Sequence, residues 1–209
     1  MTVGMKEILA GNPVCAIMRG VPSEKALAYA QAAYRGGVRL FEVAMNTQGG
    51  TEQIALLRRE FGTDVYVGAG TVINTERCKA AHEAGAQFFL TPNAAQETLR
   101  YCKDNGIPLL PGVMTPTDVG VCLDYGYDIM KLFPAGDLPM SYIKSLKGPF
   151  DGTQYVAVGG VKLENIAEFL KAGFIGVGIG SNLIPKEFVR NDDWDSAADY
   201  VKRFFERIR

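Results

Sequence analysis

The sequence contains few of the residues that build zinc, disulfide or nucleic-acid sites. Its single histidine, His82, excludes a catalytic zinc site held by three imidazoles, and its mid-helix position suggests a structural role on an outer layer. The four cysteines form no CxxC pair, which excludes a zinc-finger spacing and a disulfide framework and favours reduced thiols. With 22 basic and 23 acidic residues and no basic patch, nucleic acid is not an expected partner.

Long apolar runs are absent as well. No run approaches the roughly 20 residues that span a bilayer, and the opening "MTVGMKEILAGNP" is too polar for a secretory signal. We therefore expect a cytoplasmic protein with no membrane partner. The 209 residues, 47% of them hydrophobic, can bury a large core, and we expect a single domain over residues 1–209.

Short apolar runs alternate with helical patterns about eight times along the chain, which is typical of strand–helix units. Helices are expected in segments such as 23–37 and 163–173, with Ser23 and Asn74 as N-cap candidates. Units of about 26 residues predict an α/β fold, namely a single (β/α)8 TIM barrel with a short N-terminal helix. A doubly wound open sheet is the alternative. The predicted strands are 14–19, 38–45, 64–70, 86–92, 107–113, 127–133, 153–160 and 174–181.

Lys131 stands in the middle of an apolar strand, between Met130 and Leu132. Burying an ammonium group costs several kcal/mol unless the charge is paired or neutralised, so the position needs an explanation. Burial lowers the pKa of a lysine, and the free amine is a nucleophile that condenses with carbonyl carbon. The resulting protonated imine withdraws electrons and lets a carbon–carbon bond break. Schiff-base chemistry is therefore one interpretation of Lys131.

That chemistry also needs a group that moves protons. Glu42 lies late in the second predicted strand, between Phe41 and Val43, which would face the helices. In a partly apolar pocket its pKa would rise toward the range of a general acid or base. The alternative is a structural ion pair between Glu42 and Lys131.

Further polar and glycine residues stand at strand ends, where barrel sites are built. Arg19 could clamp a carboxylate or phosphate, or it could close the rim through a salt bridge. Thr71 could donate to a substrate oxygen or cap the next helix. The pairs Gly159–Gly160 and Gly180–Ser181 could present backbone N–H groups to a phosphate, or simply allow tight turns.

The segments "FEVAMNT", "VGAGTVIN", "GAQFFLTPN", "PLLPGVMTPT", "KLFPAG", "GGV" and "GIGSNL" follow one another in a recognisable order. In order and spacing the chain resembles the bacterial 2-keto-3-deoxy-6-phosphogluconate (KDPG) aldolases, a family that includes 4-hydroxy-2-oxoglutarate and 6-phosphogalactonate aldolases. The resemblance extends from about residue 5 to 205. It implies a homotrimeric class I aldolase that uses no metal and no cofactor. Its partner would be a small phosphorylated keto sugar acid, cleaved to pyruvate and glyceraldehyde 3-phosphate.

The resemblance also implies roles for single residues. The Schiff-base lysine of the family falls on Lys131, the acid/base glutamate on Glu42, and a carboxylate-binding position on Thr71. The remaining family positions are the "TP" proline at Pro92 and the phosphate contacts at Gly159, Gly160, Gly180 and Ser181.

Two positions depart from the gluconate-type pattern. Val158 stands where a threonine is usual and Asn46 where an arginine is frequent, and the galactonate-specific relatives resemble this chain at both. The segments 110–117 and 146–150 look closer to gluconate-type members, so the gluconate substrate is predicted, with 4-hydroxy-2-oxoglutarate as an additional one. The alternatives are the galactonate epimer, a phosphate-binding isomerase or synthase that uses Lys131 as an acid, and a sugar-phosphate sensor without chemistry.

Overall fold

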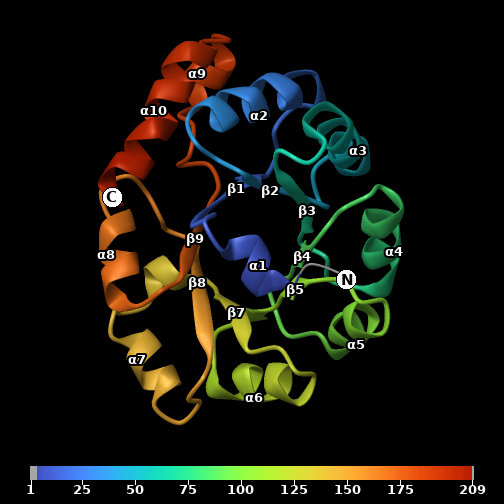
Figure 1. Cartoon of the computed structure of the whole chain (residues 1–209), viewed down its shortest axis with the longest axis vertical. Coiled ribbons are helices and arrows are strands. Elements are labelled where there is room, and N and C mark those ends of the chain that lie inside the picture. The colour runs from blue at the N-terminus through green and yellow to red at the C-terminus, as the bar shows by residue number, and fades with distance from the viewer. Residues whose placement is uncertain (1–3, 209) are drawn as a thin grey trace.

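Parallel strands form a ring inside a layer of helices in the computed structural model, which describes residues 4–208 (Figure 1). The order around the ring is β5-β4-β3-β2-β1-β9-β8-β7-β6, and each hydrogen-bonded pair is parallel. The two ends of this order, β5 and β6, follow each other in the chain, so the ring is nearly closed. The predicted α/β TIM-type barrel is confirmed and the open sheet is wrong. The strands are β1 Val14–Met18, β2 Leu40–Ala44, β3 Tyr66–Gly70, β4 Phe89–Leu90, β5 Leu109–Leu110, β6 Gly112–Val113, β7 Ile129–Leu132, β8 Gln154–Val158 and β9 Gly176–Ile179.

Helices follow most strands and cover the outside of the ring (Figure 1). Within residues 4–208, none is long and apolar enough to cross a membrane. The helices are α1 Met5–Leu9, α2 Ala26–Arg35, α3 Gly50–Phe61, α4 Thr75–Glu83, α5 Gln96–Asp104, α6 Pro116–Asp124, α7 Tyr142–Lys147, α8 Ile166–Ala172, α9 Lys186–Arg190 and α10 Trp194–Arg207, with 3-10 turns η1 Ser23–Lys25 and η2 Ala135–Asp137.

The strand predicted at 107–113 is split into β5 and β6 by Pro111. Proline has no N–H to donate, so it cannot continue a ladder on both sides. Its carbonyl nevertheless accepts a hydrogen bond from the Lys131 N–H at 2.8 Å, which ties the split strand to β7. Within residues 4–208 the sheet therefore has nine strands, of which β5 and β6 together take the place of one strand of an eight-stranded barrel.

Side chains alternate between the barrel interior and the helix layer, as a period of two requires. The interior contains Cys15, Ile17 and Val158, whereas the flanking residues predicted to face the helices do so. Helix α1 closes one end of the barrel with Met5, Ile8 and Leu9, and in the view of Figure 1 it lies over the centre of the ring. Burying each such side chain contributes about 1.5–3 kcal/mol. The carboxyl ends of the strands are left for a site.

The predicted helix starts had different outcomes. Asn74 caps α4, because its Oδ1 accepts a hydrogen bond from the Arg77 N–H at 2.9 Å. Ser23 is not the N-cap of α2: it begins the turn η1, and its hydroxyl donates to the Gln48 carbonyl at 3.4 Å. The serine is thus used by a neighbouring loop rather than by its own helix.

Candidate active site

Lys131 and Glu42 occupy opposite sides of the barrel, in β7 and β2. Their residues are 3% and 1% exposed, so both side chains are removed from bulk water. Three strands, β1, β9 and β8, separate them along one side of the ring. In the part of the chain that the structure describes, the two groups form no ion pair, so the alternative of a structural salt bridge is wrong.

The surroundings shift the two pKa values in opposite directions. Desolvation lowers the pKa of the Lys131 ammonium below its usual 10.5, and the Glu42 carboxylate only partly offsets this. Desolvation likewise raises the pKa of the Glu42 carboxyl above 4.5, against the opposing effects of Lys131 and Arg19. Neither carboxyl oxygen of Glu42 accepts a hydrogen bond from residues 4–208. Burial thus favours the neutral form of both groups, the amine of Lys131 and the carboxyl of Glu42.

Gly70 supplies the space for the Glu42 carboxyl. It is the last residue of β3, beside Ala44 of β2, and a Cβ built on it would overlap Oε1 of Glu42. The backbone of Gly70 is not in the left-handed region, so the glycine is needed for room rather than for conformation. Sequence reasoning placed Gly70 in a strand and missed this contact.

Arg19, Asn46 and Thr71 form one polar cluster at the mouth. The Arg19 guanidinium donates to Oγ1 of Thr71 at 3.2 Å and to Oδ1 of Asn46 at 3.4 Å. Thr71 has a φ of 58°, which is unusual for a β-branched residue, and its carbonyl accepts from Arg77 at 2.9 Å. Arg19 forms no salt bridge with residues 4–208, so the alternative of a salt bridge at the rim is wrong. Asn74 rather than Thr71 caps α4, so the alternative of a capping role for Thr71 is also wrong.

A cavity of about 220 Å³, here the Lys131 cavity, joins the lysine to the glycine loops. Gly159 and Gly160 have φ values of 90° and 74°, a conformation that favours glycine. The Gly159 carbonyl accepts a hydrogen bond from the Gly136 N–H at 2.8 Å, which fixes the first loop. Predicted site residues that line this cavity are Arg19, Lys131, Val158, Gly159, Gly160, Gly180 and Ser181.

Pro92 is half-buried in the loop after β4 and does not line the Lys131 cavity. Two neighbours of predicted residues have contacts that sequence reasoning missed. Thr91 is fully buried, and its Oγ1 accepts from the Gly112 N–H at 3.0 Å. Asn182 lines the Lys131 cavity and donates from Nδ2 to the Val161 carbonyl at 3.0 Å, joining the two glycine loops. In the sequence, Thr91 is part of the "TP" motif and Asn182 directly follows "GIGS", and these positions could have marked both residues as site candidates.

Clusters of possible metal ligands are not found between residues 4 and 208: no three histidine, cysteine or acidic side chains are grouped. His82 is exposed on α4, on the outer layer as predicted. Lys131 and Glu42 are the two charged residues that are buried within residues 4–208.

Residues 5–199 match the family profile described as KDPG and KHG aldolase. Among curated relatives, a 2-dehydro-3-deoxy-6-phosphogalactonate aldolase of Escherichia coli strain K12 is 33% identical over 199 residues, covering 94% of this chain and 97% of that protein. A 2-dehydro-3-deoxy-phosphogluconate aldolase of Treponema pallidum is also 33% identical, over 172 residues, covering 82% of this chain and 81% of the relative.

Solved structures give the same picture. A KDPG aldolase from Legionella pneumophila, with pyruvate captured at low pH as a covalent carbinolamine intermediate, superposes with a TM-score of 0.85 at 30% identity and covers 94% of this chain and 95% of its own. A native KDPGal structure reaches 0.83 at 32% identity, covering 94% and 96%.

Proposed function

Because the chain belongs to the KDPG and KHG aldolase family and is a carbon–carbon lyase, we propose that its substrate is 2-keto-3-deoxy-6-phosphogluconate. The products are pyruvate and D-glyceraldehyde 3-phosphate, and 4-hydroxy-2-oxoglutarate is cleaved to pyruvate and glyoxylate as a second reaction. The observation that carries the proposal is that Lys131 and Glu42 are both buried in the barrel and form no ion pair with each other.

The reaction begins when Nζ of Lys131 attacks the C2 ketone and water leaves, giving a protonated imine. Glu42, directly or through one water, takes the C4 hydroxyl proton as the C3–C4 bond breaks. The bonding electrons move toward the imine nitrogen, the aldehyde leaves, and an enamine remains. Protonation at C3 and hydrolysis then release pyruvate and restore the free amine.

The cluster at the mouth orients the substrate in this proposal. Arg19 and Thr71 bind the carboxylate end, because guanidinium and hydroxyl groups suit its oxygens and Arg19 already contacts Thr71. The backbone N–H groups of Gly159–Gly160 and Gly180–Ser181 receive the phosphate. Pro92 shapes the rim near the pyruvate end.

Reduction with borohydride in the presence of pyruvate tests the proposal. We expect one adduct of pyruvate on Lys131, found by peptide mass mapping, because borohydride reduces the imine to a stable amine. A control without pyruvate should remain unmodified. No adduct, or one on another lysine, would contradict the Schiff base and favour an isomerase or synthase that uses Lys131 as an acid.

The galactonate epimer is the second candidate, favoured by Val158 and Asn46. Val158 is 4% exposed and lines the Lys131 cavity, so no hydroxyl is offered there to the substrate. A single neutral hydrogen bond contributes about 0.5–1.5 kcal/mol, which is at most roughly tenfold in rate. Parallel assays with the two C4 epimers therefore decide between the substrates.

Gly70→Ala should displace the Glu42 carboxyl and lower kcat by roughly 100-fold, since a misplacement of about 1 Å can cost that much. The measurement is the initial rate of pyruvate release together with the thermal unfolding midpoint. Gly120→Ala on α6 is the matched control, because a Cβ there meets open space and its rate should be unchanged. Wild-type turnover in Gly70→Ala would show that the position of Glu42 does not matter.

We also propose a cytoplasmic homotrimer. Met114 and Ile73, two large apolar side chains at the rim, are 45% and 38% exposed in the single chain, and an interface between copies would cover such residues. All four cysteines are free and buried, which suits a reducing compartment.

A further inference from the structure

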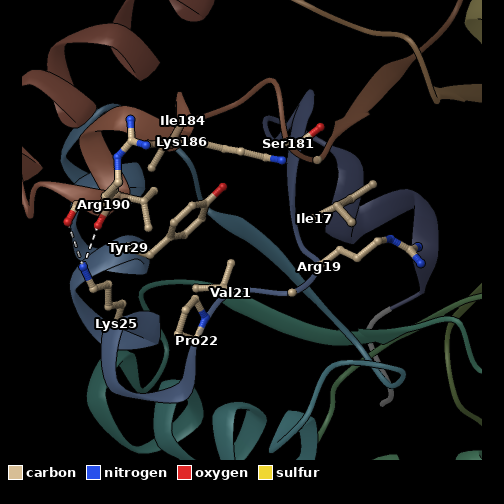
Figure 2. Close-up of a pocket in the computed structure, with 13 residues that line it drawn as sticks. Ile17, Arg19, Val21, Pro22, Lys25, Tyr29, Ser181, Ile184, Lys186 and Arg190 are labelled. Atoms are coloured by element: carbon tan, nitrogen blue, oxygen red, sulfur yellow. Dashed lines mark hydrogen bonds between the residues drawn. The ribbon is translucent and has the colours of Figure 1, made fainter.

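A second cavity, of about 320 Å³, lies beside the Lys131 cavity (Figure 2). We call it the α2–α9 cavity, because residues of α2 and α9 form its walls. It shares Ile17, Arg19, Gly180 and Ser181 with the Lys131 cavity, so the two meet at the loop proposed to hold phosphate. A phosphate bound at Ser181 would have this second cavity on its other side.

The charged residues lining the α2–α9 cavity are all cations, namely Arg19, Lys25, Lys186 and Arg190. No acidic residue lines it, so the cavity favours an anion. Lys25 already has protein partners: its Nζ donates to the Val189 carbonyl at 2.8 Å and forms a salt bridge with Asp192 at 3.0 Å. Arg19 is held by Thr71 and Asn46.

The ammonium group of Lys186, by contrast, has no such partner among residues 4–208. In residues 4–208 its ammonium forms no ion pair and no hydrogen bond with another side chain or carbonyl. Figure 2 shows its side chain reaching across the cavity toward Ser181. The glycine loops offer N–H donors without a net charge, whereas a phosphate monoester carries about −1.5 to −2 at pH 7. Lys186 is therefore placed to supply the missing charge.

Tyr29 gives the cavity a second free donor. Its side chain is 4% exposed, its hydroxyl makes no hydrogen bond to any residue that the structure describes, and Figure 2 shows the hydroxyl directed into the cavity. A hydroxyl that lines a cavity and has no protein partner can donate to a polar ligand atom there. Burial also raises the pKa of Tyr29, which keeps the hydroxyl protonated and able to donate.

We propose that Lys186 binds the substrate phosphate from the cavity side of Ser181, that Tyr29 donates a second hydrogen bond, and that this pair makes the enzyme prefer phosphorylated substrates. The inference rests on the proposed aldolase function and adds two ligands to its phosphate site. Val21, Pro22 and Ile184 supply apolar lining beside these polar groups.

The test is the condensation of pyruvate with D-glyceraldehyde 3-phosphate and with unphosphorylated D-glyceraldehyde. Lys186→Met should raise KM for the phosphorylated aldehyde about tenfold or more, as expected for a lost charge-assisted hydrogen bond, with kcat changed less than about twofold. Tyr29→Phe should shift the same KM about threefold. Lys186→Arg should keep most of the preference, and Lys202→Met, which removes a lysine from the outer helix α10, should keep all of it.

The ratio of kcat/KM for the two aldehydes decides the matter. If this ratio is unchanged in Lys186→Met, because kcat/KM is either unaltered or reduced equally for both aldehydes, the role of Lys186 is overturned. Wild-type protein that uses both aldehydes equally well would contradict this inference alone. Wild-type protein that makes no product with either would contradict the proposed function instead. Thermal unfolding should be unaltered in Tyr29→Phe, because the lost hydroxyl has no protein partner.

Discussion

Lys131→Met should abolish aldol cleavage, with kcat reduced roughly 10⁴-fold or more, because the variant has no amine to form the imine. The side chain is nearly the same length, so the barrel should keep its shape. Pyruvate release followed continuously, together with the borohydride reaction, measures the loss. The adduct should vanish with the activity, and a variant that still turns over substrate would refute the mechanism.

The same substitution should make the protein more stable at pH 7. The folded-state pKa of Lys131 lies below its unfolded value of 10.5, so folding favours the neutral amine. That contribution is fully present above pH 10.5 and is lost as pH falls through the lowered pKa. Lys131→Met removes the group that must be protonated, and its denaturant midpoint should exceed that of wild type most at low pH.

Lys131→Arg is the matched control for this pair of effects. Its guanidinium stays charged at all working pH values and is a poor nucleophile, so the variant should also be inactive. Because the charge is now permanently buried, Lys131→Arg should be less stable than Lys131→Met. Equal unfolding midpoints for the two variants would show that burial of the charge has no cost at this position.

Glu42→Gln should lower kcat by about 10²- to 10⁴-fold, the usual contribution of a general acid or base. The amide has the same shape but cannot take the C4 hydroxyl proton. Pyruvate and borohydride should still mark Lys131, because the amine remains. Glu52→Gln on α3 is the control, since it removes an exposed carboxylate outside the barrel and should leave the rate unchanged.

The pH dependence separates the two groups further. Glu42 acts as a base only when ionised, and burial raises its pKa above 4.5, so wild-type kcat should rise with pH through that raised value. In Glu42→Gln this acidic limb should disappear. The limb due to Lys131, which needs the free amine, should remain in the profile of kcat/KM. An unchanged acidic limb in the variant would remove Glu42 from the proton transfer.

Local patterns in the sequence were sufficient for the barrel and for the orientation of its strands. The alternation around Glu42 and Lys131 predicted that Phe41, Val43, Met130 and Leu132 face the helices, and they do. This works because strand side chains alternate strictly, so each position's face follows from its neighbours alone. The same rule indicated that the two ionisable groups point into the barrel.

Features that depend on the closing of the ring could not be predicted in this way. Pro111 splits a strand, yet the ring stays linked through its carbonyl. Arg19 contacts Asn46 and Thr71, which lie 27 and 52 positions further along the chain. Gly70 makes room for the Glu42 carboxyl on the neighbouring strand, and Lys186 and Tyr29 line one cavity with Ser181 from two different helices. These contacts depend on strand register and helix packing, which are set by the whole chain rather than by any one segment of it.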